Sequence, residues 1–163
     1  VSLAQQRTGT SLDGLGWLIV ASGLAGTLSS HVWGVFSDRS SKAVMAMGAA
    51  GSAILGVMVL LALNLTPQLA DSIIFYAAIM FLLGVSHAGV RIGRKTHIVD
   101  LAGGDNKAEY VALSNTIIGV FLLFAGVLTA LILGLGLEAG IAVLTLLAFA
   151  GAAMALSMKN VQK

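Results

Sequence analysis

The chain has 163 residues and a formal net charge of +2, and 58% of its residues are hydrophobic while only 10% are charged. Soluble domains have about 45–50% apolar and about 25% charged residues. With a mean hydropathy of +0.97, the composition excludes an ordinary soluble domain and indicates an integral membrane protein. The sequence has no cysteine, which excludes a disulfide scaffold, a thiolate metal site and a cysteine nucleophile.

Long uncharged stretches recur along the whole chain. A helix needs about 20 apolar residues to cross the roughly 30 Å hydrocarbon core of a bilayer. A transmembrane β-barrel does not fit, because its strands are alternating segments of about 10 residues and these stretches are continuously apolar. We therefore predict an all-α membrane protein with five transmembrane helices, at 15–36, 43–63, 72–90, 110–134 and 139–158.

Basic residues lie almost entirely in one set of connections between the predicted helices. The other set contains only Arg7. Because lysine and arginine concentrate in cytoplasmic loops, we predict that the C-terminus is cytoplasmic and that the N-terminus of the sequence, the 64–71 loop and the 135–138 turn lie outside. The predicted cytoplasmic residues are Arg39, Lys42, Arg91, Arg94, Lys95, Lys107, Lys159 and Lys163.

The third predicted span continues into a basic segment that we expect to remain helical up to Gly103-Gly104. His87, Arg91, Arg94 and Lys95 share one face of that helix. This face is interpreted either as an anchor to anionic lipid or as a gating contact. His87 is the candidate proton-titrating group, since an unperturbed histidine has a pKa of about 6.5; the alternative is a packing histidine.

Polar side chains are concentrated in the first, third and fourth spans. Because polar groups in hydrocarbon are costly, they tend to face protein or water. We therefore predict that these three helices line a pathway, and that the second and fifth are outer, lipid-facing helices. Stripes of small residues on the first and fourth spans have a second interpretation as helix packing. The candidate cavity or solute-lining residues are Ser22, Ser29, Trp33, Tyr76 and Asn115.

No motif in the sequence indicates catalysis. The glycine-rich run at 89–96 lacks the spacing of a phosphate loop, and the chain has no His-Glu-x-x-His pair. The five spans contain no aspartate or glutamate, and the histidines are too scattered for a proposed metal site. We predict that the protein is not an enzyme and has neither metal nor cofactor. Membrane lipids are expected partners, and nucleic acid is not.

One specific motif stands between the first two predicted spans. The segment at 34–42 reads Gly-Val-Phe-Ser-Asp-Arg-Ser-Ser-Lys. It resembles the signature loop of the major facilitator superfamily, G-x-L-x-D-R-x-G-R. Gly34, Asp38 and Arg39 match it, Lys42 replaces a basic arginine, Phe36 replaces leucine, and Ser41 replaces the second glycine.

The resemblance implies a twelve-helix transporter fold built from two six-helix bundles. In the family, the loop follows the second helix of each bundle and is more degenerate in the C-terminal one. We therefore place the chain as helices eight to twelve, with the first helix of the bundle missing or reduced to residues 1–14. The rival placement is helices two to six, but the Gly-Pro and Arg-x-x-Gln-Gly patterns that could accompany it are absent from the sequence. The missing N-terminal bundle would be the partner, in a bacterial cytoplasmic membrane.

The resemblance also implies a function and a role for the motif. It suggests part of a secondary active transporter that moves a small solute by alternating access. Asp38 would stabilise the outward-facing state by pairing with a neighbouring helix terminus, with Arg39 and Lys42 as partners or lipid anchors. Alternatively, Asp38 and Lys42 merely solvate a tight turn. The competing function is a non-transporting oligomeric membrane scaffold.

Overall fold

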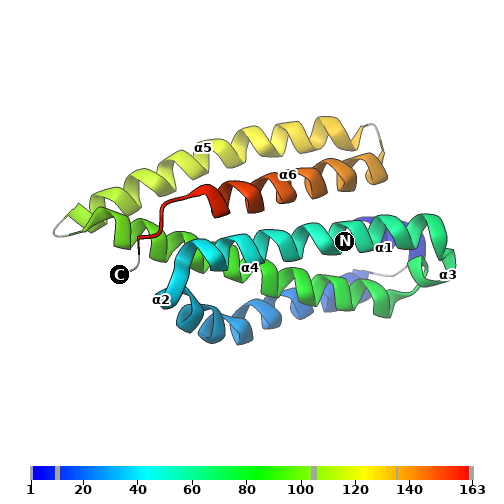
Figure 1. Ribbon diagram of the computed structural model, residues 1–163. Coiled ribbons are helices and arrows are strands. Elements are labelled where there is room, and N and C mark those ends of the chain that lie inside the picture. Colours follow the sequence, from blue (N-terminus) through cyan, green and yellow to red (C-terminus); the bar gives the residue numbers. More distant parts are fainter. Residues whose placement is uncertain (1, 10–11, 104–105, 135, 162–163) are drawn as a thin grey trace.

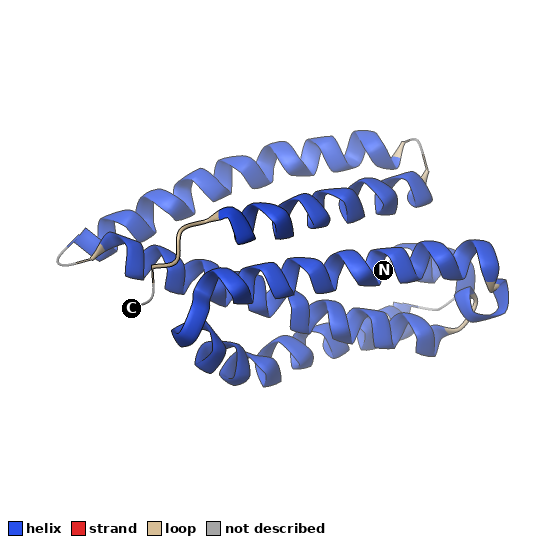
Figure 2. Cartoon of the chain, viewed as in Figure 1, coloured by secondary structure: helices blue, strands red, loops and turns tan. Residues whose placement is uncertain are grey.

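The computed structural model describes residues 2–9, 12–103, 106–134 and 136–161. Within these ranges every regular element is a helix (Figure 2), which agrees with the predicted all-α class. The helices are α1 (Ser2–Thr8), α2 (Leu12–Leu65), α3 (Pro67–Ala70), α4 (Ile73–Ala102), α5 (Lys107–Leu133) and α6 (Leu137–Ser157).

Helix α2 contains both of the first two predicted spans. Its 54 residues would measure about 80 Å as a straight helix, which is more than twice the hydrocarbon thickness. A break at Ser40, where φ is −160° and ψ is 96°, lets the second half run back beside the first (Figure 1). Four described helices are long and apolar enough to cross a membrane, and α2 provides two of the five predicted crossings.

Helix α4 continues well beyond its predicted span. It ends at Ala102, and Gly103 then has a φ of +56°, in the left-handed region that glycine adopts at little cost. This agrees with the predicted helix stop, although Gly104 lies outside the described residues. At 30 residues, α4 is about 45 Å long, so one end extends past a hydrocarbon core.

The connections between helices lie at two opposite ends of the bundle, in the two groups that the charge pattern predicts. At one end, a guanidinium nitrogen of Arg7 lies 4.0 Å from a carboxylate oxygen of Asp71, and another lies 3.8 Å from one of Glu138. These contacts bring α1, the 64–71 connection and the start of α6 together. At the other end, Lys42 Nζ donates a hydrogen bond of 3.3 Å to the carbonyl oxygen of Met158. The break in α2 and the C-terminal end of α6 are therefore neighbours.

Glycines allow both halves of α2 to approach α4 closely. A Cβ atom added at Gly48 would lie 2.6 Å from the carbonyl oxygen of Ser86, and one at Gly93 would lie 2.8 Å from that of Ser41. A Cβ at Gly84 would collide with the backbone of Ser22. Only residues without side chains permit backbones to come this near. These glycines therefore serve helix packing.

The burial of the second span differs from the prediction. The second half of α2 was expected on the lipid-facing periphery, but it packs between α4 and α6. By contrast, the described residues at 120–128 of α5 are all exposed. Apolar side chains suit lipid and protein equally, so composition alone could not separate the two environments. The buried hydrophobic residues of the second half of α2 are Val44, Met45, Ala46, Ala53, Leu55, Val59, Ala62 and Leu63.

Replacing Gly48 with alanine should destabilise the bundle. In an exposed helix this change is stabilising by about 1 kcal/mol, but here the added methyl group meets backbone atoms of α4 at 2.6 and 2.9 Å. Overpacking of this kind costs about 1–3 kcal/mol. Gly119→Ala is the matched control, because nothing lies within 4 Å of its Cβ position on α5. Unfolding in detergent should show a lower stability for Gly48→Ala than for the parent, and a stability for Gly119→Ala that equals or exceeds that of the parent. The opposite order of stabilities would contradict the packing role.

Candidate functional site

The break in α2 directs neighbouring serines and charged residues to different environments. Ser37 and Ser41 are fully buried, whereas Asp38 and Arg39 are exposed. The Ser41 hydroxyl oxygen lies 3.0 Å from Nδ1 of the buried His97 on α4, so the break is joined to α4 by a polar contact. The Ser37 hydroxyl has no hydrogen-bond partner among the described residues.

Sequence reasoning missed the contact between Ser41 and His97. A signal for it exists, because Ser86, Gly89, Gly93 and His97 recur at helical spacing and all four are buried on α4. Three of these are small residues that admit a neighbouring helix, and the fourth is the polar residue at the end of the stripe. The stripe thus marks the α4 face that α2 covers.

The four residues of the predicted gate motif have different surroundings. Asp38 lines a cavity of about 400 Å³, together with Asp100 near the end of α4 and Lys107 at the start of α5. Lys42 is bound to the end of α6 through its hydrogen bond to a carbonyl oxygen. Arg39 is exposed, and nothing lies within 4 Å of a Cβ position at Gly34. The motif therefore faces α4, α5 and α6 at one end of the bundle.

A polar cavity of about 870 Å³ lies between the first half of α2, α4 and α5. Its volume falls within the range of about 300–1,000 Å³ typical of small-molecule sites. Glycines of α2 and α4, the side chain of Val90 on α4 and two apolar side chains of α5 form the rest of its described wall. The polar and charged residues that line it are Ser22, Thr27, Ser30, His87, Arg91 and Arg94.

Four of the five predicted solute-lining residues are not among those that line this cavity. The indole Nε1 of Trp33 donates a hydrogen bond of 2.8 Å to the carbonyl oxygen of Val85, so this ring joins α2 to α4. Ser29 donates to the carbonyl oxygen of Gly26 over 3.4 Å. Asn115 is exposed on α5. Of the predicted set, Ser22 is the one that lines the cavity.

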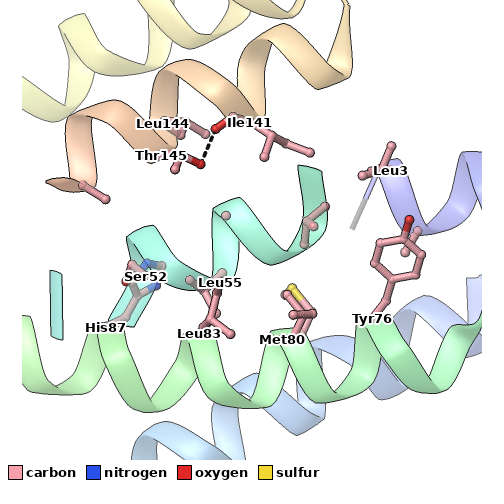
Figure 3. Close-up of a pocket in the computed structure, with 15 residues that line it drawn as sticks. Leu3, Ser52, Leu55, Tyr76, Met80, Leu83, His87, Ile141, Leu144 and Thr145 are labelled. Atoms are coloured by element: carbon pink, nitrogen blue, oxygen red, sulfur yellow. Dashed lines mark hydrogen bonds between the residues drawn. The ribbon is translucent and has the colours of Figure 1, made fainter. Parts of the chain in front are cut away.

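Tyr76 belongs to a second, mostly apolar cavity of about 400 Å³ between α1, the second half of α2, α4 and α6 (Figure 3). Its hydroxyl oxygen is buried without a hydrogen-bond partner among the described residues. Its ring meets that of Phe75 edge-on, with centroids 5.3 Å apart. His87 lines both cavities, and Figure 3 places it beside Ser52.

The basic face predicted on α4 is divided by the structure. Arg91 and Arg94 line the polar cavity, and Nη2 of Arg91 lies 3.6 Å from the Cβ position of Gly26 on α2. Lys95 is exposed and is not among the lining residues. No group of three or more histidine, cysteine or acidic residues in the described ranges could hold a metal ion.

Comparison with known proteins identifies the family of the chain. Residues 1–161 match the sequence profile of the Major Facilitator Superfamily. The chain belongs to this superfamily. Searches of curated proteins and of solved structures give no significant match. Major facilitator superfamily members are transporters, and together with the long apolar helices this establishes a multi-pass integral membrane protein of a transporter family.

Proposed function

We propose that the chain is the C-terminal half of a secondary active transporter that moves a small solute by alternating access. The observation that carries this proposal is the cavity of about 870 Å³ with six polar or charged lining residues, enclosed by otherwise apolar helices. Polar groups at membrane depth are rare and usually mark a substrate or ion pathway. A polar cavity between helices suits transport.

Asp38 is the proposed conformational gate. It faces the start of α5 across a small cavity, and the N-terminus of a helix carries about half a positive charge. A carboxylate there stabilises one arrangement of α2 and α5 and loses that contact when they separate. Lys42 holds the same end of the bundle to α6, so the motif couples three helices that alternating access would move.

The proposed partner is a second helix bundle that faces the polar cavity, since alternating access requires two bundles to rock about a site between them. We propose that this chain supplies helices eight to twelve. The end of the bundle with Asp38 and the C-terminal residues faces the cytoplasm, and Arg7 faces the outside. The support is the charge distribution between the two ends.

A non-transporting scaffold fits the structure less well. Small residues in a scaffold would form stripes that join separate copies. Here the glycines at 48, 84 and 93 are already used between α2 and α4 of the same chain. The polar cavity also has no purpose in a scaffold.

Thiol labelling of Ser22→Cys in the full-length protein tests alternating access without knowledge of the solute. Ser22 is half-buried and lines the polar cavity. This chain has no cysteine, and any cysteine elsewhere in the full-length protein is first replaced. An impermeant reagent should reach this position from either side of sealed vesicles, because the cavity opens to each side in turn. Labelling from one side alone, or none, would support the scaffold instead.

The orientation can be tested with two single-cysteine variants at exposed positions. Ser2→Cys should react with an impermeant reagent added outside intact cells, since α1 lies at the end that contains Arg7. Lys159→Cys should react only after the membrane is permeabilised. Both positions are exposed, so a failure to react cannot be assigned to burial. The reverse pattern would invert the proposed topology.

Asp38→Asn should shift the conformational equilibrium toward the inward-facing state. A charge at a helix terminus contributes about 0.3–1 kcal/mol when exposed and up to about 2 kcal/mol when partly buried, which is a change of a few-fold to about thirtyfold. Labelling of Ser22→Cys should then rise from the cytoplasmic side and fall from the outside. Glu109→Gln, an exposed carboxylate near the same end that is absent from the Asp38 cavity, is the control. Unchanged labelling in the Asp38 variant would contradict the gate.

A further inference from the structure

We propose that the polar cavity binds a hydroxylated organic anion, with Arg91 and Arg94 holding its charged group. The inference rests on the proposed transport function for the biological role of the anion. The binding itself follows from the residues of the cavity and can be tested without any transport measurement.

Positive charge dominates the cavity. Two guanidinium groups line it, and the described residues of its lining include no aspartate or glutamate. Arg7, at the opposite end of the bundle, instead has the carboxylates of Asp71 and Glu138 within 4.0 Å. Each guanidinium carries a positive charge, and Nε of Arg94 is buried. Buried charge is costly without a counterion, and an anionic ligand would supply one.

The geometry of the two arginines suits an anion better than a neutral solute. Nε of Arg94 is buried and has no hydrogen-bond partner among the described residues. The guanidinium of Arg91 reaches across to α2 at Gly26, where the missing side chain leaves room for it. The planar guanidinium presents several N–H donors in a fork that matches carboxylate or phosphate oxygens. The α4 wall of the cavity therefore offers an N–H donor without a partner, at Arg94, and a guanidinium that a ligand can reach, at Arg91.

The hydroxyl groups on the α2 wall of the cavity set a second requirement for the ligand. Thr27 donates its hydroxyl proton to the carbonyl oxygen of Gly23 over 3.0 Å, and Ser30 donates to that of Gly26 over 2.6 Å. Both hydroxyl oxygens therefore remain available as acceptors toward the cavity. Acceptors repel an anionic group but receive hydrogen bonds from ligand hydroxyls. The ligand should thus carry a negative group at the α4 side and O–H donors at the α2 side.

Lipid anchoring does not explain this arrangement. A basic residue that anchors a helix extends to the membrane surface. Lys95 has that character, since it is exposed and outside the cavity wall. Arg91 is exposed too, but Arg91 and the half-buried Arg94 line a space between three helices. The same chemistry could still be met by the headgroup of an anionic lipid that enters from the side, and the experiment separates this source from a soluble anion.

The test measures thermal stabilisation of the purified full-length protein in a neutral detergent, using gluconate as the probe and sorbitol as its uncharged counterpart. A ligand that binds only the folded state raises the midpoint of unfolding in a saturable manner. Gluconate should do so and sorbitol should not. Arg91→Gln and Arg94→Gln should each weaken the apparent affinity about tenfold or more, because hydrogen bonds to charged groups are the strong ones. Lys95→Gln removes the same charge from the same helix outside the cavity and should leave the affinity unchanged.

A parallel titration with dihexanoyl phosphatidylglycerol and dihexanoyl phosphatidylcholine identifies the source of the anion. Stabilisation by the phosphatidylglycerol alone, with the same dependence on Arg91 and Arg94, supports the anion site and assigns it to a lipid headgroup. Arg91→Lys keeps the positive charge but loses the forked guanidinium. It should bind gluconate more weakly than the parent but more tightly than Arg91→Gln. This order shows that Arg91→Gln has lost a binding group and is not merely misfolded. No saturable stabilisation by either anion, or full stabilisation of both glutamine variants, overturns the proposal. Gluconate binding without two-sided labelling of Ser22→Cys would reject alternating access and leave the anion site intact.

Discussion

The close approach of α2 to α4 is the constraint on which the rest of the structure depends. Both halves of α2 contact α4 at positions where a single added carbon would collide with backbone atoms. In a membrane, apolar burial does not drive helices together, because lipid is as apolar as the protein, so dispersion contacts between close backbones must hold the bundle. The break at Ser40 allows one helix to make this contact twice, and this packing holds the α2 and α4 walls of the polar cavity together.

The same packing controls where charge can lie. At one end Arg7 has two carboxylates within 4.0 Å, so the connections there are joined by ion pairs. In the polar cavity Arg91 and Arg94 line the wall, and the described lining residues include no acidic side chain. A membrane protein that keeps such groups in a cavity has to compensate them by other means. This contrast between paired and unpaired cations is the electrostatic basis of the proposed site.

Some features of the fold could be predicted from the sequence because they depend on local signals. A charged turn marks the break between the first two spans, and a glycine marks the end of α4 at Gly103. The count of basic residues groups the connections at two ends. The cavity was only partly readable. Of the predicted lining residues, Ser22 lines it, whereas Trp33 and Ser29 bond to the backbone, Asn115 lies exposed and Tyr76 lines the other cavity. His87, Arg91 and Arg94 also line it, although the sequence predicted them as a titrating group and a basic face. Helical spacing places residues on a common face but does not say which neighbour covers that face.

The sequence by itself determined the membrane environment, the all-α class and the family motif, because hydropathy, the length of the apolar stretches and the 34–42 segment are properties of the chain alone. Only the tertiary structure decided that one face of the second span is buried against α4 and α6 while residues 120–128 of α5 are exposed, that Ser41 meets His97, and that Arg91 and Arg94 line a cavity while Lys95 does not. Apolar side chains are equally soluble in lipid and in protein, and a helix has several faces of similar composition. The choice between them therefore depends on which backbones can approach one another, and that is settled by pairs of residues far apart in the sequence.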